Sequence, residues 1–297
     1  MSAKPVSILP ASTITALLEP LTTARWSVHD TAWVAQLRAR RRRLRWGAWR
    51  RRWTPWRRRT RASVRAEYER VWSRPYPNLA VPTGGVHVVW DGHVHRIGKL
   101  TINRFYVALL HAILERVRPR TVLDLGCGHG MNTLILAAMH PSIRFTGVEL
   151  TATGLARARD VQRGLLPRGF SKLAPAPLVD ATAHQRVQWV QADASRLPLK
   201  AAAVDMVISC LALEQMDSVR QEVLRELRRV AAAGYVGIEP FADWNTASSK
   251  QDYITNFSYW RGDLAELEGA GFTVRESSDA FPQKVLFGVG LVWAEIR

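Results

Sequence analysis

Residues 122–130, VLDLGCGHG, constrain the fold of this chain more than any other stretch. Val122, Leu123 and Leu125 surround a single acid, Asp124, in a pattern typical of a short buried strand. Glycines follow at alternate positions, and the next residues, MNTLILAAM, have the apolar spacing of a helix. Glycine lets the backbone approach a ligand closely, and the unpaired N–H groups of the first helical turn point at it. The stretch therefore predicts a strand, a ligand-binding turn and a helix.

A second acid follows at the distance expected for ribose binding. Residues 143–150, IRFTGVEL, form the next predicted strand, and Glu149 lies near its end, about 20 residues after the glycines. Further strands and helices then alternate, which is typical of a parallel sheet covered on both faces. The predicted strands are 187–191, 204–210 and 234–238, and the predicted helices are about 130–140, 151–164, 217–230 and 260–269. The last apolar runs, 272–276 and 284–296, are expected to pair antiparallel.

Four motifs in this order resemble those of the class I S-adenosylmethionine-dependent methyltransferases: VLDLGCGHG, the acid of VEL, the Asp-Ala of ADASRLPL, and VDMVISCLALEQM. The later motifs are similar to the small-molecule branch that includes ubiquinone and menaquinone methyltransferases. The resemblance covers about residues 100–297. It implies a doubly wound, Rossmann-like α/β fold with a seven-stranded, mostly parallel sheet and an antiparallel last strand. It also implies adenosylmethionine as the methyl donor, lying across the strand ends. A nicotinamide-binding fold prefers two residues between its second and third glycines, whereas one separates Gly128 from Gly130.

The resemblance assigns donor-binding roles to residues of each motif. The glycine turn is expected to approach the methionine half of the donor: Gly126, Cys127, Gly128 and Gly130. Glu149 is expected to bind the ribose, Asp193 to accept a hydrogen bond from the adenine amino group, and Ala194 to offer its backbone N–H. Asp124 is expected to support the turn or to reach the donor's ammonium group through water. Two residues at the end of the fourth strand are expected to line the methyl-donor pocket: Cys210 and Leu211.

An acceptor that reacts at oxygen or carbon also loses a proton, so a base is expected near the strand ends. Glu214 follows the fourth strand and Glu239 ends the fifth. These two carboxylates are the first candidates for the catalytic base. For each, the alternative role is that of a helix cap or a surface acid.

A third candidate base lies in residues 87–95, HVVWDGHVH, where Asp-Gly between two β-favouring runs predicts a hairpin. The expected pairing puts His93 and His95 on the same face as Val88 and Trp90. A lid with two imidazoles would suit proton transfer, which makes His95 a candidate; the alternative is a polar surface patch. No third ligand with recognisable spacing accompanies the histidines, so we expect no metal.

The first third of the chain carries a strongly basic segment. From Arg38 to Arg61 there are thirteen arginines and no acid, within a chain of net charge +17. Three tryptophans fall on one side of a predicted helix: Trp46, Trp49 and Trp53. Gly47 is expected to break the helix between this tryptophan side and an earlier apolar stripe that lies on another face. Thr54-Pro55 predicts the N-cap and first residue of a further helix that ends at about Trp72.

Three kinds of partner suit this basic segment. Arginine-rich helices with a tryptophan side lie well at an anionic membrane surface. The same composition can grip phosphates and stack on bases, or it can remain solvated or dock on an acidic protein. The regular tryptophan spacing favours the membrane over nucleic acid for residues 38–61.

The chain is therefore expected to divide into an N-terminal segment (1–37), an Arg/Trp-rich helical arm (38–75), a hairpin with its lead-in (76–100) and a methyltransferase domain (101–297). Residues 165–186 are a predicted loop insertion, and 239–260 are expected to help bind the acceptor through Asp243, Trp244, Asn245 and Tyr253. No apolar run reaches the roughly 18 residues of a membrane span. The N-terminus lacks a convincing secretory pattern, and two cysteines predict no disulfide framework.

These features predict a cytoplasmic, peripherally membrane-associated methyltransferase. Its acceptor is expected to be small or lipid-linked and to react at oxygen or carbon. One alternative is an RNA methyltransferase that captures its substrate with the basic arm. The other is a non-catalytic scaffold that keeps the cofactor fold.

Overall fold

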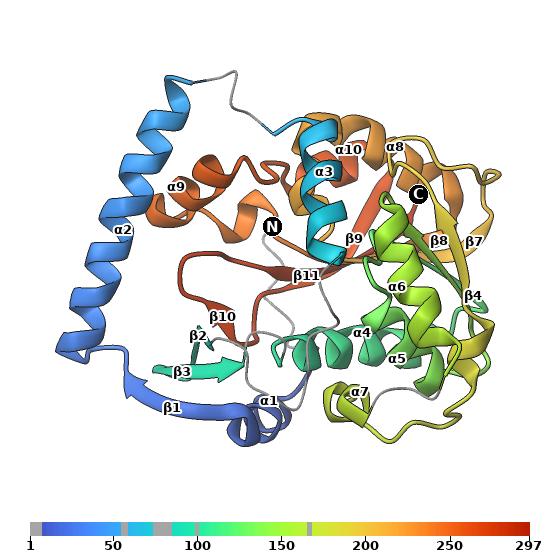
Figure 1. The fold of residues 1–297 in the computed structure, drawn as a ribbon, viewed down its shortest axis with the longest axis horizontal. Helices are drawn as coiled ribbons and strands as arrows, with labels where there is room; N and C mark the ends of the chain where they lie inside the picture. Colours follow the sequence, from blue (N-terminus) through green and yellow to red (C-terminus); the bar gives the residue numbers. More distant parts are fainter. Residues whose placement is uncertain (1–7, 55–58, 74–84, 99–100, 165–167) are drawn as a thin grey trace.

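A seven-stranded sheet forms the centre of the computed structural model, which describes residues 8–54, 59–73, 85–98, 101–164 and 168–297 (Figure 1). The strand order is β6-β5-β4-β7-β8-β11-β9. The strands are β4 (Thr121–Leu125), β5 (Arg144–Glu149), β6 (Gln188–Gln191), β7 (Val204–Cys210), β8 (Ala231–Glu239), β9 (Phe272–Ser278) and β11 (Gly290–Ile296). Strands β4 to β8 are parallel, and β11 runs antiparallel to both of its neighbours. The predicted mostly parallel sheet with an antiparallel last strand is confirmed.

Helices cover both faces of this sheet, because alternate strand residues point to opposite sides. Val122 belongs to one buried apolar cluster and its neighbour Leu123 to the other. The first cluster is built largely on α4 (Asn103–Val117) and α5 (Met131–Met139), and the second on α8 (Arg220–Val230). Further helices are α6 (Ala152–Gln162), α7 (Arg168–Leu173) and α10 (Leu264–Gly269), with short 3-10 turns η3 (Ala183–Arg186), η4 (Leu213–Gln215), η5 (Asp217–Val219) and η6 (Ala242–Trp244).

A smaller antiparallel sheet lies beside the first, in the order β1-β3-β2-β10. Its strands are β1 (Thr22–Ser27), β2 (Gly85–Trp90), β3 (His93–Gly98) and β10 (Gln283–Lys284). The predicted hairpin is β2-β3, and it pairs Trp90 with His93 and Val88 with His95 as expected. Asp91 and Gly92 both have positive φ, 45° and 69°, as a tight hairpin turn requires.

The N-terminal residues pack into the main core. Helix α1 (Ala11–Leu18), which the 3-10 turn η1 (Glu19–Leu21) follows, buries Ile14, Leu17 and Leu18. These three side chains belong to the same apolar cluster as α4 and α5. Trp90 Nε1 of β2 also donates to Thr15 Oγ1 over 3.1 Å. Helix α1 is therefore part of the same folded body.

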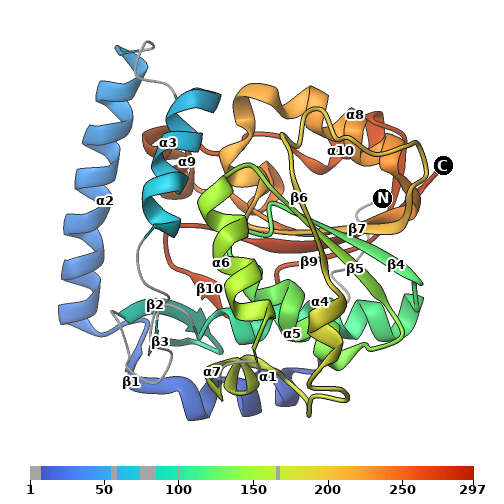
Figure 2. The same ribbon diagram turned by 45° about the vertical axis from the view of Figure 1, so that its right-hand side comes forward.

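Residues 38–52 of the basic segment belong to one long helix, α2 (Thr31–Arg52), which lies along the outer side of α9 (Ser248–Phe257) (Figures 1 and 2). Asp30 caps it by accepting a hydrogen bond from Trp33 N. The predicted break at Gly47 is wrong, because the helix continues through this residue. Gly47 instead makes room for α9, since a Cβ atom there would lie 2.2 Å from Asn256 Oδ1. Arg51 donates to the Asn256 carbonyl over 3.1 Å and holds the same crossing.

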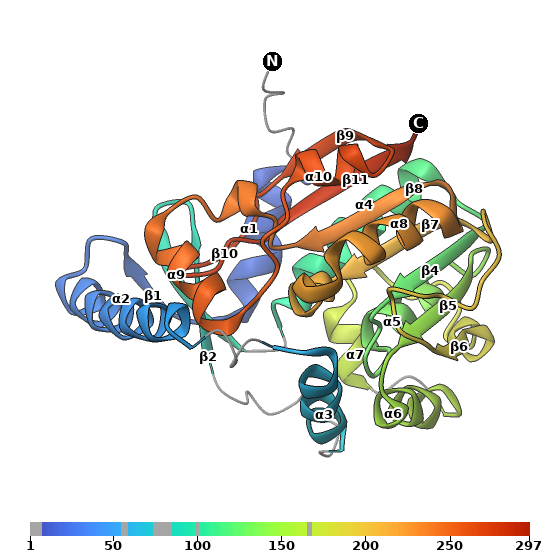
Figure 3. The same ribbon diagram turned by 90° about the horizontal axis from the view of Figure 1, so that it is seen from above.

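A separate helix, α3 (Arg61–Trp72), lies beside α6 (Figures 1 and 3). Its end at Trp72 agrees with the prediction, but the predicted N-cap, Thr54, is wrong. Thr54 donates its hydroxyl back to the Arg50 carbonyl of α2, whereas Thr60 and Ser63 form a capping box at the start of α3. Pro55 lies outside the described residues. Within the described ranges, no helix combines the length and the apolarity that crossing a bilayer needs.

Candidate functional site

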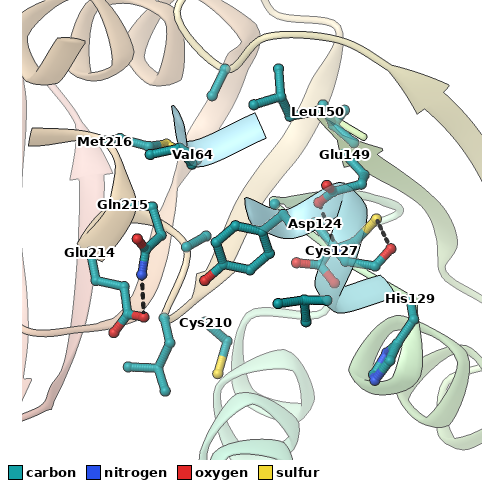
Figure 4. A pocket seen from close by; sticks show the side chains of 18 of the residues that line it. Val64, Asp124, Cys127, His129, Glu149, Leu150, Cys210, Glu214, Gln215 and Met216 are labelled. Carbon is teal, nitrogen blue, oxygen red and sulfur yellow. Dashed lines mark hydrogen bonds between the residues drawn. The ribbon is translucent and has the colours of Figure 1, made fainter. Parts of the chain in front are cut away.

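A pocket of about 570 Å³ lies at the carboxyl ends of the central strands. Its walls come from the turns after β4, β5, β6 and β7, from α3 and from the aromatic segment around α9. Strand β4 has β5 on one side and β7 on the other, so the pocket lies where the strand order reverses, the usual ligand position in such sheets. Figure 4 shows Asp124, Cys127 and Glu149 on one side of it and Glu214 and Gln215 on the other.

The glycine turn after β4 forms the floor of the donor half. Gly126 and Gly128 have φ values of 72° and 57°, which favour glycine. Gly126 N and Cys127 N both donate to the Val148 carbonyl and tie the turn to β5. Asp124 is buried beneath the turn, and burial raises its pKa to about 6.

Gly130 is the one predicted donor residue that does not line the pocket. It precedes α5 with a φ of 77°, and a Cβ there would lie 2.5 Å from the Trp189 ring. Its role in the fold is therefore close packing of the turn against β6.

Glu149 joins the glycine turn to the start of α6. Its carboxylate accepts hydrogen bonds from Gly128 N at 3.1 Å, Thr151 N at 3.0 Å and Thr151 Oγ1 at 2.6 Å. Burial raises the pKa of this carboxyl, and the hydrogen bonds from Thr151 oppose that effect. Glu149 therefore lines the pocket between the glycine turn and the start of α6. A ribose bound there would contact both segments.

The turns after β6 and β7 bring in the remaining predicted donor residues. Asp193 Oδ1 accepts hydrogen bonds from Ser195 N and Oγ, and Ala194 lies beside it in the pocket wall. Cys210 and Leu211 line the pocket at the end of β7, where Leu211 has a φ of 53° and donates its N–H to Ile238 O.

The lining suits a small cationic cofactor such as the expected donor. It contains more carboxylates than basic side chains: Asp124, Glu149, Asp193 and Glu214 against Arg61 and Lys284. The glycine turn also presents backbone without Cβ atoms to the same space. The structure thus brings together all of the predicted donor residues except Gly130.

Glu214 is the candidate base that the structure places in the pocket. It lies in η4, directly after β7, and its Oε1 accepts a hydrogen bond from Gln215 Nε2 over 2.7 Å. Burial raises the pKa of its carboxyl to about 7. Tyr253 and Tyr259 line the pocket as well, so the carboxyl faces a space with phenol groups around it.

Glu239 and His95 do not line the pocket. Glu239 is fully buried, and its Oε1 accepts hydrogen bonds from Ser209 Oγ at 2.7 Å and Ala212 N at 2.9 Å. It therefore braces the turn between β7 and Glu214, and burial raises its pKa to about 8. His95 is buried in the smaller sheet, with Nδ1 3.2 Å from Thr22 Oγ1.

The aromatic segment contributes Tyr253 but not its other expected residues. Asn245 is buried; it donates to Gly288 O and accepts from Gly288 N, both over 2.9 Å. Asp243 accepts a hydrogen bond from Leu264 N at the start of α10. These side chains fix the loop. The described part of the predicted insertion, 168–186, includes α7, which packs on α4 and α5 and contributes no lining residue.

Tyr259 lines the pocket from within the segment 239–260, which was expected to help bind the acceptor. Other lining residues were missed by the sequence reasoning: Val64, Tyr68 and Trp72 of α3, and Lys284 of β10. No local motif marks them, because they reach the pocket only through the packing of the arm and of the smaller sheet.

A cluster of potential metal ligands lies apart from this pocket. His111 and Glu115 of α4 and His140 after α5 offer ligand atoms that lie within 4.8 Å of one another. His140 Nε2 lies 3.0 Å from His111 Nδ1, and His140 Nδ1 lies 3.2 Å from Glu115 Oε1. Burial lowers the pKa of His140 to about 4, so neutral imidazoles in a hydrogen-bonded row account for these contacts.

Comparison with known proteins identifies the central part of the chain. Residues 123–236 match a family model described as "Methyltransferase domain". The trans-aconitate 2-methyltransferase of Methylobacterium nodulans is 33% identical over 160 residues, which cover 52% of this chain and 58% of that protein. The malonyl-[acyl-carrier protein] O-methyltransferase of Laribacter hongkongensis is 36% identical over 119 residues, which cover 39% and 35%.

Among solved structures, the [4+2]-cyclase SpnF has a similar fold, with a TM-score of 0.55 and 19% identity over 80% of this chain and 97% of that one. This likeness concerns the fold alone. The chain spans between about a third and three fifths of the length of the two curated relatives. The match to the family model begins in β4 and ends in β8, so α2, α3 and the segment around α9 lie outside it.

Proposed function

We propose that this chain, which carries a class I S-adenosylmethionine-dependent methyltransferase domain, transfers a methyl group to an oxygen atom of a small or lipid-linked acceptor. The observation that carries the proposal is the position of Glu214, a half-buried carboxyl with a pKa of about 7 that faces the same pocket as the donor residues. One of the relatives is a malonyl-[acyl-carrier protein] O-methyltransferase, which supports oxygen over carbon.

Adenosylmethionine supplies, when bound, an electrophilic methyl group on a positively charged sulfur. The chain's own residues would hold it: Glu149 at the ribose, Asp193 and Ala194 at the adenine, and the glycine turn at the methionine half. The work of the protein is then to align the acceptor oxygen with that methyl group and to exclude water.

Glu214 would remove the proton from the acceptor hydroxyl. A carboxyl with a pKa near 7 is ionised in a large fraction of molecules at neutral pH, and it is a stronger base than an ordinary glutamate. Gln215 orients it through their hydrogen bond. The tyrosines at 253 and 259 would supply apolar walls and hydroxyl groups for an acceptor with a polar centre.

The test follows tritium from methyl-labelled adenosylmethionine into a host lysate to which the purified protein is added. Label is expected in the organic-soluble or small-metabolite fraction. Mild alkaline hydrolysis would release this label from a methyl ester and would leave it in a methyl ether. Glu214→Gln should lose the transfer while still binding the donor. Label in the RNA fraction would overturn the proposal in favour of an RNA methyltransferase that uses the arm for capture.

We also propose that α2 holds the protein at an anionic membrane surface. Trp46, Trp49 and Trp53 are exposed by 61%, 51% and 68%, and their rings form a continuous row with centroid distances of 5.1 and 6.5 Å. The opposite side of α2, with Trp33, Leu44 and Ala48, is buried. Exposed arginines flank the tryptophan row, so indole rings and guanidinium groups meet the solvent together.

Sedimentation with vesicles tests this anchoring. The full-length protein should sediment with vesicles that contain phosphatidylserine more than with pure phosphatidylcholine, and high salt should reduce the difference. The triple substitution Trp46→Ala, Trp49→Ala, Trp53→Ala should remove most of the binding. Val179→Ala, another exposed apolar side chain, is the matched control. Equal sedimentation of the triple variant and the wild type would contradict the proposal.

A further inference from the structure

Helix α3 forms a wall of the pocket, although it lies outside the residues that match the methyltransferase family. Several of its side chains line the pocket together with the glycine turn, Glu149 and Asp193: Arg61, Val64, Tyr68, Val71 and Trp72. In Figure 4, Val64 lies on the side of Met216, and Glu149 and Leu150 lie on the other side. A helix of the arm therefore closes a site that the central domain leaves open.

Glu69 attaches this wall to the start of α6. Its carboxylate accepts hydrogen bonds from Ala152 N at 3.1 Å, Thr153 N at 3.2 Å and Thr153 Oγ1 at 2.5 Å. The free N–H groups of a helix start carry partial positive charge and favour a carboxylate. Arg157, one turn later on α6, donates to the Trp72 carbonyl over 3.3 Å. The last turn of α3 is thus held beside the segment that follows Glu149.

Trp72 extends from this turn over the donor-binding backbone. A Cβ atom at Gly128 would lie 2.7 Å from Trp72 Cζ2, and one at Gly154 would lie 3.0 Å from Trp72 Cδ1. The indole ring also packs on the His129 ring, with centroids 4.6 Å apart. Its Nε1 is buried and has no hydrogen-bond partner among the described residues. A buried N–H group in a pocket wall is expected to have an acceptor, which here would come from a ligand.

The other end of α3 has a weaker attachment. Arg61 Nε lies 3.6 Å from Asp193 Oδ2 and Arg61 Nη2 donates to Ser195 Oγ, both from an arginine side chain that is half exposed. Exposed ion pairs of this kind contribute little to stability. Val64 is the only fully buried residue of the helix. Few apolar contacts would be lost if α3 moved away from the domain, so this helix is among the elements that can open at low cost.

From these contacts we propose that α3 is a removable wall of the donor site. Glu69 is the positioning residue that seats it on α6, and the seated Trp72 contacts the donor, with its Nε1 donating to a carboxylate or hydroxyl oxygen of that molecule. Donor entry and product release would require α3 to leave α6. The inference rests on the proposed function to the extent that it requires adenosylmethionine to bind.

Binding and release of tritiated adenosylmethionine, followed by rapid filtration on the full-length protein, test the role of Glu69. Glu69→Gln should release the donor about tenfold faster, because hydrogen bonds to a charged group are lost. Thr153→Val should accelerate release less than Glu69→Gln does. The double variant should release the donor as fast as Glu69→Gln alone, because both substitutions act on the same contact between Glu69 and Thr153. Glu67→Gln is the matched control, since it removes the same charge from α3 but pairs with Arg59.

Trp72→Phe tests the indole N–H separately, because it keeps an aromatic ring and loses only the donor group. It should weaken donor binding and leave the melting temperature unchanged. Hydrogen exchange of the α3 amides should slow on donor addition in the wild type and not in Glu69→Gln.

Two negative results are distinguishable. If the wild type binds no adenosylmethionine, the proposed function fails together with this inference. If the wild type binds it, and Glu69→Gln matches Glu67→Gln in release rate and in amide exchange, the inference alone is overturned.

Discussion

Gln215 Nε2 donates a hydrogen bond to Glu214 Oε1 over 2.7 Å, and this bond opposes the effect of burial on the Glu214 carboxyl. Because the base is the ionised form, kcat/KM should rise with pH through about 7 and level off above it. Glu214→Gln should abolish this rise of kcat/KM with pH and lower kcat about 10²- to 10⁴-fold. Gln215→Ala should move the midpoint of the pH profile upward, since the ionised carboxylate loses a donor.

A suitable control for these profiles is Glu222→Gln, an exposed glutamate of α8. A wild-type profile that stays flat between pH 5 and pH 9 would remove Glu214 from the role of base.

The residues proposed to bind the donor differ in how much they also contribute to the stability of the fold. Glu149 also holds Gly128 N and Thr151, so Glu149→Ala should lower both the donor affinity and the melting temperature. Asp193→Asn should lower the affinity by about 1–3 kcal/mol with little change in stability, because Asp193 braces its own turn and its ion pair with Arg61 is exposed. Calorimetric titration with adenosylmethionine measures the first quantity. Asp160→Asn on the exposed side of α6 should change neither.

The buried carboxyl of Glu239 should make the folded protein less stable at alkaline pH. Its pKa is about 8 in the folded protein and 4.5 in its ordinary state, so between these values the folded state binds more protons than the unfolded state. The free energy of unfolding therefore falls as pH rises from about 5 to 8. Glu239→Gln keeps an acceptor for Ser209 and Ala212 without a charge. Urea titrations should find it more stable than the wild type at pH 9, by on the order of 2 kcal/mol, and a wild type that is the more stable there would refute the assignment.

His140 produces the opposite dependence. Burial lowers its pKa to about 4 from 6.5, so the unfolded state binds more protons between these values and stability is lost as pH falls through that window. His140→Asn should be less stable than the wild type at pH 7, because the bonds to His111 and Glu115 are lost. Its melting temperature should also depend less on pH between 6.5 and 4. If the melting temperatures of the two proteins change equally with pH over this range, groups other than His140 cause the loss of stability in acid.

The central sheet could be predicted because its strands are marked by local patterns. Val204–Cys210 agrees with the predicted strand at both ends, and the helix after the glycine turn, α5, lies within the predicted range. Apolar alternation, glycines with positive φ and acids at strand ends are all dictated by contacts within a few residues or by the geometry of a parallel sheet. The same local signals mark nine of the ten residues expected to bind the donor, and all nine line the pocket; Gly130 is the exception.

The arm could not be predicted in this way, because its structure is decided by distant contacts. Gly47 has a low helix propensity, yet α2 continues through it. Asn256 of α9 occupies the space where a side chain would be, and this distant contact explains why the residue is a glycine. Thr54-Pro55 has the composition of a helix start, but Thr60 forms the cap. The position of Glu214 in a pocket and of Glu239 behind it likewise depends on how the turn after β7 folds, which residue type alone does not indicate.

The core contacts of α1 have a practical consequence for how this protein is produced. A recombinant fragment that begins just before α4 would lose Ile14, Leu17 and Leu18, which are buried against α4 and α5. Each such side chain contributes about 1.5–3 kcal/mol of burial, so the loss approaches the whole stability of an ordinary domain. Expression trials that trim the basic N-terminus to improve solubility should therefore yield aggregates, and substitution of surface residues is the better strategy.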